Sequence, residues 1–133
     1  MAIISILTIY ILFRYTDVFF KSTKCAPDNK ICHAKSDVRV LESSLELYKL
    51  DNHQYPTSKQ GLDALIAKPS DDSVPNWREG GYIKMLKKDP WGNDYRYEYP
   101  GTNGRFDVFS LGADGAVGGE GEAADIGNWN LES

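Results

Sequence analysis

The chain has little of what most enzymes and nucleic-acid-binding proteins depend on. It contains only two histidines, and neither His33 nor His53 lies in a motif that places it beside a serine or cysteine nucleophile, which disfavours nucleophilic catalysis. Its 15 lysines and arginines are scattered and are outnumbered by 19 aspartates and glutamates, so the formal net charge is -4. A nucleic-acid binder normally shows a basic patch, and we therefore expect no nucleic-acid partner.

The chain also lacks the length for a second enzyme-sized domain. Its 133 residues can bury one modest core, which predicts one globular domain with an N-terminal appendage. Cysteine is scarce as well, because Cys25 and Cys32 are the only two, and they lie close together outside the periodic core. The pair indicates either a local disulfide in an oxidising compartment or two exposed thiols, and the sequence leaves both interpretations open.

The apolar start of the chain is short for a membrane helix. Residues 1–20 are mostly apolar as far as Phe13 and are then interrupted by Arg14 and Asp17. A membrane-spanning helix needs about 20 apolar residues. The segment also lacks the basic leader and the small-residue cleavage site of a secretory signal. We interpret it as a membrane anchor or export signal, with a foreign addition as the alternative.

What the sequence does contain is one long periodic stretch, from Ser36 to Tyr55. Apolar residues recur there at i, i+3, i+7 and i+10, with two leucines widening the stripe: Val38, Leu41, Leu45 and Tyr48, then Leu47 and Leu50. This period predicts an amphipathic helix with a single buried face. The helix should end at Asp51-Asn52, because Pro56 prevents its continuation, and Pro27 suits the first turn of a helix that begins before Ser36.

A short second helix is expected after Pro56. Thr57-Ser58-Lys59-Gln60 matches a capping box, in which the side chains at the first and fourth positions each bind the other's backbone amide. Leu62, Leu65 and Ile66 provide its apolar side, and Lys68-Pro69 ends it. Residues 70–81 then form a loop whose large apolar group, Trp77, is interpreted as a lid over the helix pair, with ligand stacking as the alternative.

Strands follow a turn at residues 89–94. Tyr95, Tyr97 and Tyr99 alternate with polar residues, a period of two that predicts a strand with one buried face. Residues 100–104 reverse the chain into Arg105–Ser110, which predicts an antiparallel hairpin. We interpret the tyrosine row as part of the core, because aromatic residues favour strands, with a sugar or base platform as the alternative.

The stretch from residue 111 to residue 129 is rich in both glycine and acidic residues. Such a loop is costly to order and has little to bury, so something other than packing should hold it. Calcium is the natural candidate, because it takes carboxylate and carbonyl oxygens in flexible geometry. The loop has no cysteine or histidine for zinc and no lysine or arginine for phosphate. A loop that is simply mobile is the alternative.

Several blocks, in order along the chain, carry a resemblance to a known family. They read L-E-L-Y-K-L-D-N-H-Q-Y-P-T-S-K-Q-G-L-D-A-L (45–65), E-G-G-Y-I-K (79–84), D-P-W-G-N-D-Y (89–95), F-S-L-G-A-D-G (109–115) and D-I-G-N-W (125–129). From about Lys35 to Asn130 the chain resembles the major pseudopilins of type II secretion systems. The resemblance implies an α+β, pilin-like fold with a long N-terminal helix on a small antiparallel sheet, a short second helix and a C-terminal calcium loop.

The resemblance also implies a structural role without catalysis. Such subunits assemble with copies of themselves, with minor pseudopilins and with inner-membrane secretion components, through an apolar N-terminal helix that holds the native precursor in the membrane. They lie in the inner membrane before assembly and afterwards in a periplasmic pseudopilus that drives folded proteins across the outer membrane. The competing hypothesis is a calcium-dependent extracellular module that binds glycan or protein through the tyrosine row and Trp77 or Trp91.

For the metal site, the resemblance implies Asp114 and Asp125 as side-chain ligands and the carbonyls of Leu111 and Ala116 as backbone ligands. Many family members have a second aspartate where this chain has Ala124, and we expect Glu122, Glu120, a carbonyl or a water to fill that place. Residues 1–34 do not contain the glycine-ending leader and F-T-L-x-E start of family precursors. We therefore divide the chain into an unmatched N-terminal segment, 1–34, and a pseudopilin domain, 35–133.

Overall fold

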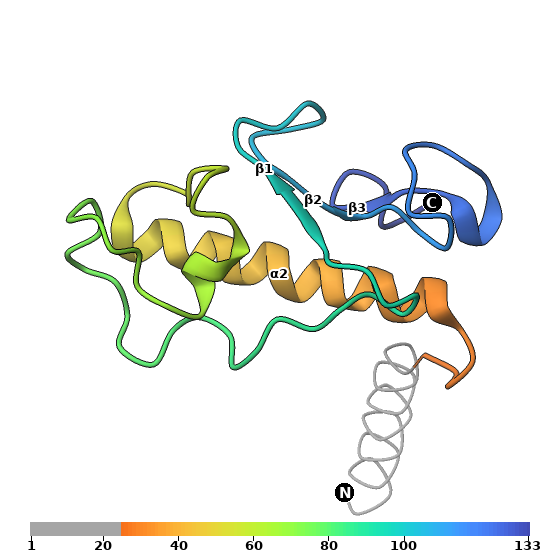
Figure 1. Cartoon of the computed structure of the whole chain (residues 1–133), viewed down its shortest axis with the longest axis horizontal. Coiled ribbons are helices and arrows are strands. Elements are labelled where there is room, and N and C mark those ends of the chain that lie inside the picture. The colour runs from red at the N-terminus through yellow and green to blue at the C-terminus, as the bar shows by residue number, and fades with distance from the viewer. Residues whose placement is uncertain (1–24) are drawn as a thin grey trace, which may run out of the picture.

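The computed structural model describes residues 25–133 as one long helix beside a small antiparallel sheet (Figure 1). The elements in chain order are the helix α2 (Lys30–Asn52), the 3-10 helix η1 (Leu62–Leu65), the strands β1 (Arg96–Glu98) and β2 (Asp107–Ser110), the 3-10 helix η2 (Gly121–Ala123) and the strand β3 (Ile126–Gly127). The strands are ordered β1-β2-β3, and both pairs are antiparallel. The predicted α+β fold, with a long helix on a small antiparallel sheet, is confirmed.

The anchor or export signal predicted in residues 1–20 lies outside the described residues. Within residues 25–133, no helix combines the length and the apolar character needed to cross a bilayer. The predicted boundary between residues 34 and 35 falls inside α2, whose buried face begins at Ala34.

The ends of α2 have identifiable caps. At the N-terminus the side chain of Asn29 accepts a hydrogen bond from the Cys32 amide at 2.9 Å, and Cys25 and Cys32 are joined by a disulfide across this first turn. Pro27 lies in the turn before the helix. At the C-terminus the helix ends at Asn52, as predicted, and His53 takes the left-handed conformation, with a φ of 62°.

The buried face of α2 packs against the hairpin. Its predicted apolar residues are buried in one cluster with residues of the hairpin: Val38, Leu41, Leu45 and Tyr48 with Tyr95, Phe106 and Val108. The prediction that Leu47 and Leu50 widen this face is wrong, because they are 39% and 73% exposed. At 3.6 residues per turn, Leu50 lies about 140° around the helix from Leu45 and cannot reach the same partners.

The hairpin is confirmed, with Tyr97 of β1 opposite Val108 of β2. The tyrosine row is buried at one end only. Tyr95 is buried and its hydroxyl donates to Asp37 of α2 at 2.8 Å, and the half-buried Tyr97 donates to the Pro56 carbonyl at 2.7 Å. Tyr99 departs from the prediction because it lies beyond the end of β1, where it is exposed and forms a T-shaped pair with the Tyr55 ring.

The predicted capping box forms, but the helix after it is a single 3-10 turn. The Gln60 amide donates to Thr57 Oγ1 at 3.1 Å, and the Thr57 amide donates to Gln60 Oε1 at 2.9 Å. Leu62 and Leu65 are buried as predicted. Ile66 is exposed instead, because three residues per 3-10 turn place Leu62 and Leu65 on one face and rotate Ile66 away from it.

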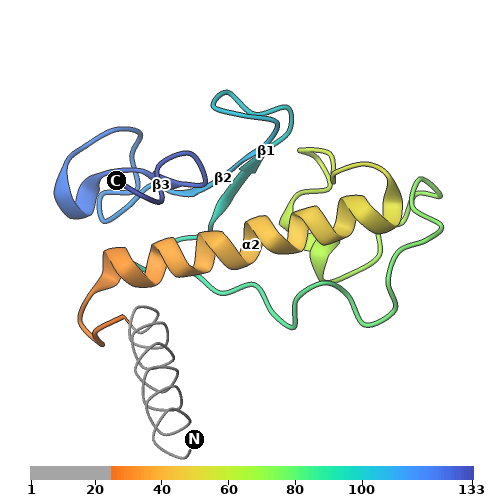
Figure 2. The ribbon, with the colours of Figure 1, turned by 180° about the vertical axis from the view of Figure 1, so that it is seen from behind.

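The chain from η1 to β1 runs along α2 on the side away from the sheet and the C-terminal loop. This arrangement is visible in both views, in which the sheet lies above α2 and the connecting segment lies below it (Figures 1 and 2). The C-terminal residues return to the helix, where Arg39 pairs with Glu132 at 2.8 Å. In the connecting segment, Arg78 pairs with Asp51 of α2 at 3.0 Å, so both long segments that surround the helix are bound to it.

Candidate functional site

The glycine-rich loop leaves β2 at Leu111 and returns to the sheet at Ile126. The Ala113 amide donates to the Glu122 carbonyl at 2.7 Å and closes the loop near its base. Five glycines of the loop have positive φ angles, and two of them, Gly112 at 75° and Gly119 at 93°, also lie against neighbouring backbone. A Cβ at Gly112 would lie 2.7 Å from the carbonyl oxygens of both Glu122 and Ala124, and one at Gly119 would lie 2.5 Å from that of Ala123. These two glycines are therefore required by close approach of the backbone as well as by conformation.

The two predicted aspartate ligands bind the same short segment of the loop. Asp114 is exposed, and its Oδ1 accepts from the Ala116 amide at 3.1 Å. Asp125 is half-buried at the far end of the loop, and its Oδ2 accepts from the Gly118 amide at 3.0 Å. Residues that are distant in the loop sequence are thus brought towards residues 116–118.

The second oxygen of Asp125 is the feature that fits a cation. Asp125 Oδ1 is buried and has no hydrogen-bond partner. A buried, unpaired carboxylate oxygen is costly unless a donor or a cation satisfies it. The predicted ligand set, which adds Asp114 and the carbonyls of Leu111 and Ala116, consists of oxygen atoms, and calcium prefers such donors.

The structure does not gather the acidic side chains into one cluster. Across residues 25–133, no group of three or more histidine, cysteine, aspartate or glutamate side chains lies together in a way that could hold a metal. The side chain of Glu122 is exposed, and its carbonyl already accepts from Ala113. The ligand set of Leu111, Asp114, Ala116, Glu122 and Asp125 stays a prediction that depends mainly on two aspartates and backbone carbonyls.

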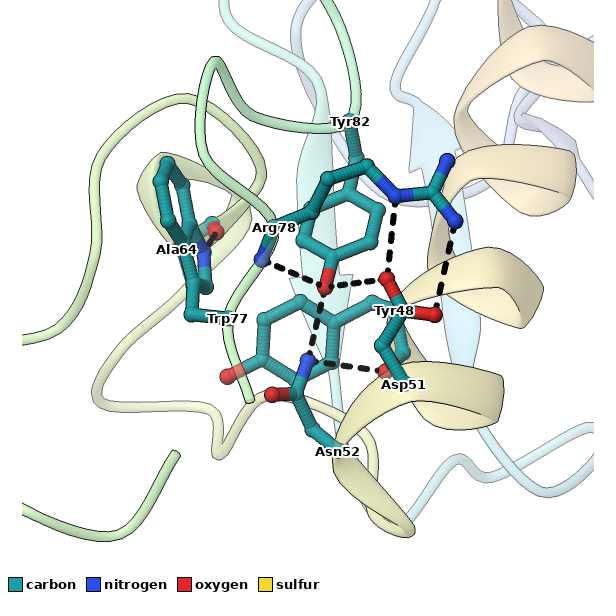
Figure 3. Close-up of polar contacts among 7 residues, drawn as sticks. All are labelled: Tyr48, Asp51, Asn52, Ala64, Trp77, Arg78 and Tyr82. Atoms are coloured by element: carbon teal, nitrogen blue, oxygen red, sulfur yellow. Dashed lines mark hydrogen bonds and ion pairs between the residues drawn. The ribbon is translucent and has the colours of Figure 1, made fainter. Parts of the chain in front are cut away.

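Trp77 and its neighbours belong to the fold. Trp77 Nε1 donates to the Ala64 carbonyl at 2.8 Å, and the ring stands edge-on to Tyr82 at 6.0 Å between centroids (Figure 3). The Tyr82 hydroxyl in turn contacts Asp51 and Asn52 at the end of α2, at 3.0 and 2.9 Å. Burial in this cluster raises the pKa of the Tyr82 hydroxyl. The contacts of Trp77 are those of the predicted lid over the helix pair.

Of the other aromatic residues in the binding hypothesis, Tyr99 is exposed, and a single ring does not make a platform. Tyr95 and Tyr97 direct their hydroxyls to Asp37 and Pro56, and Trp91 is half-buried, with an indole nitrogen that no solvent reaches. Stacking a sugar or a base would need exposed, unpacked rings. The packing of these residues counts against the glycan- or protein-binding hypothesis.

Sequence reasoning missed one buried polar group beside the loop. Asp89 and Ser110 are only 4% and 0% exposed, and the Ser110 hydroxyl donates to Asp89 Oδ2 at 2.7 Å. The only sequence signal was the turn-forming character of D-P-W-G-N-D, which does not indicate that Asp89 reaches a serine 21 residues later.

A long helix on a small antiparallel sheet, with a glycine-rich loop between β2 and β3, is the architecture of a pilin-like protein. The sequence profile of the family described as "Type II secretion system (T2SS), protein G" matches residues 22–129. The chain belongs to this family. The match begins before residue 35, where the resemblance noted in the sequence was expected to begin.

Individual relatives agree with the family match. The chain is 61% identical over 99 residues to the type II secretion system core protein G of Vibrio cholerae serotype O1, covering 74% of this chain and 68% of that protein. It is 52% identical over 106 residues to the protein of the same name from Pseudomonas aeruginosa, covering 78% and 75%. The crystal structure of the major pseudopilin from the type 2 secretion system of enterohaemorrhagic Escherichia coli is similar, with a TM-score of 0.65 and 42% identity over 80% of this chain and 97% of that one.

Proposed function

We propose that this chain is a structural subunit of a type II secretion pseudopilus. The observation that carries the proposal is the similarity, in both sequence and fold, to a solved major pseudopilin. In this role the packed helix and sheet form the rigid body of the subunit, and the work of the protein is assembly.

The finer features of the role follow from the same family. The chain would polymerise with copies of itself and contact minor pseudopilins and inner-membrane secretion components. It would lie in the inner membrane before assembly and in a periplasmic fibre of a Gram-negative bacterium afterwards, where the fibre drives folded proteins across the outer membrane. It would have no catalytic task. The disulfide between Cys25 and Cys32 supports an oxidising compartment of this kind.

We further propose that the loop binds Ca²⁺ through Asp114 and Asp125, with the carbonyls of Leu111 and Ala116 and with Glu122 or a water completing the shell. The unpartnered Asp125 oxygen and the glycine-dependent backbone support this site. The ion would stabilise a loop that buries little apolar surface. Magnesium should substitute poorly, because it demands a smaller and nearly octahedral shell.

The structural role can be tested by measuring protein secretion in the bacterium that carries the native gene. Deletion of the native gene should stop the export of a type II cargo to the medium, and the full-length chain should restore it. A variant that replaces Leu45, which is buried in the core, should fail to restore export, whereas a matched replacement of the exposed Leu50 should succeed. Unchanged export by the deletion strain would contradict the proposal.

A further inference from the structure

We propose that Asp89 is a positioning residue for the loop, acting through Ser110 on the peptide bond between Leu111 and Gly112. This inference rests on the proposed calcium site and adds residues outside the loop to it. None of the predicted ligands is involved through its side chain.

The hydrogen bonds between these residues have only one possible direction. The Gly112 amide donates to Ser110 Oγ at 3.0 Å, and Ser110 Oγ lies 2.7 Å from Asp89 Oδ2. A backbone amide can only donate and an ionised carboxylate can only accept, so the serine accepts from Gly112 and donates its single hydrogen to Asp89. Asp89 is therefore the acceptor at the end of this series of bonds.

The turn around Asp89 holds that acceptor in place. Asp89 Oδ1 accepts from the amides of Trp91 and Asn93 at 3.0 and 2.8 Å, and its own amide donates to the Asn93 carbonyl at 2.7 Å. The ion pairs formed within residues 25–133 involve other carboxylates. Asp89 is thus fixed by three donors rather than by a cation, and hydrogen bonds to a charged acceptor are stronger than neutral ones.

Peptide geometry carries the effect to a predicted ligand. The Gly112 N–H and the Leu111 C=O belong to one planar trans peptide, in which the two groups point in opposite directions. The hydrogen bond that orients the Gly112 amide towards Ser110 therefore also aims the Leu111 carbonyl. The carbonyls of Glu122 and Ala124 confine Gly112 from another side, since a Cβ there would lie 2.7 Å from each.

Calcium titration of the full chain by calorimetry tests the role. Mutation of a residue that orients a metal ligand without binding the metal itself typically lowers metal affinity by about 10 to 100-fold. Ser110→Ala and Asp89→Asn should therefore each raise the Kd for Ca²⁺ by about tenfold or more. The asparagine has one acceptor oxygen where the carboxylate has two, so it cannot accept from both the Ser110 hydroxyl and the two amides of the turn.

Asp107→Asn is the matched control. Asp107 is a buried aspartate on the same strand as Ser110, but its carboxylate accepts from Thr102 and Asn103 in the hairpin turn, away from the loop. The change should lower the calcium-free melting temperature and leave the Kd within about twofold, because distant sites act independently.

The outcomes separate the two proposals. Calcium binding by the parent, with an unchanged Kd in both Ser110→Ala and Asp89→Asn, would overturn the positioning role and leave the site in place. An equal loss of affinity in Asp107→Asn would also overturn it, by showing a general effect of destabilisation. If the parent binds no calcium, the proposed site and this inference both fail. Should circular dichroism show that Asp89→Asn does not fold, Ser110→Ala, which removes one oxygen atom, decides the result alone.

Discussion

The helix-sheet core and the glycine-rich loop are held by different forces. In the core, apolar side chains such as Val38, Leu45 and Val108 are excluded from solvent and pack on one another. In the loop, residues 113–122 are all exposed, and the order comes from hydrogen bonds such as those from Ala113 to Glu122 and from Gly118 to Asp125. Burial of apolar surface stabilises the first region, whereas the second depends on polar contacts that water weakens.

This difference assigns a distinct role to each region. We expect the core to fold without a ligand, because its apolar side chains pack on one another. The loop has a high glycine content and little to bury, so an ion at Asp125 would replace the stabilisation that packing provides elsewhere. Core and loop should therefore respond to different perturbations.

The largest effect is expected in the core. Leu45→Ala should lower the free energy of unfolding by about 2 to 5 kcal/mol, because it removes a buried side chain and leaves a cavity. Leu50→Ala is the control on the same helix and should change it by less than about 0.5 kcal/mol, because Leu50 is exposed. Urea denaturation measures both. Equal effects of the two changes would mean that the assignment of the buried face is wrong.

In the loop, calcium should control stability. Free Ca²⁺ at a hundred times Kd should stabilise the protein by about 2.7 kcal/mol, and Asp125→Ala should abolish the gain. Asp72→Ala, a change of an exposed aspartate in another loop, should keep it. Thermal unfolding with and without chelator gives the comparison, and proteolysis should cut residues 113–122 faster under chelation. Identical melting of the parent in calcium and in chelator would disprove the metal site.

Reduction of the disulfide tests the start of α2, which belongs to neither region. The bond between Cys25 and Cys32 closes a loop with a sequence separation of 7, and its removal should cost about 2 kcal/mol, as expected for a short loop. Denaturation with and without reductant measures the difference. A variant with both cysteines changed to serine should have the unfolding free energy of the reduced protein, and reductant should not change it. If reductant also leaves the unfolding free energy of the parent unchanged, the bond does not stabilise the fold.

High pH should act on the core through its tyrosines. Burial raises the pKa of Tyr48 from its usual value near 10 to about 12, and burial also raises the pKa of Tyr95 and Tyr97. The neutral phenols therefore stabilise the fold fully below pH 10, and this contribution falls as the pH rises to about 12, by about 1.4 kcal/mol per pH unit for each such group. Unfolding free energies between pH 9 and pH 12 measure the loss. Tyr48→Phe should show a shallower fall, and an equal slope would exclude Tyr48 as a source.

Features that depend on neighbouring residues in the sequence were predicted accurately, whereas features that depend on contacts between distant segments were not. The capping box of Thr57 and Gln60 and the end of α2 at Asn52 were predictable, because both depend on residues within one turn of the chain. The helix after the capping box was predicted to be longer, and the difference lies in the single 3-10 turn that places Ile66 in solvent. For the loop, glycine and acidic content indicated a site of hard ligands, but not which oxygen atoms lie free.

By itself, the sequence determined the elements whose pattern is local: the period of Val38, Leu41 and Leu45 along the helix, and the alternation that made the hairpin. Only the tertiary structure decided which side chains remain in solvent, as with Leu50, and which distant polar groups meet, as with Asp89 and Ser110. The physical reason is that hydrophobic periodicity repeats within a few residues. A buried hydrogen bond between two segments, by contrast, depends on the register and packing of every element between them.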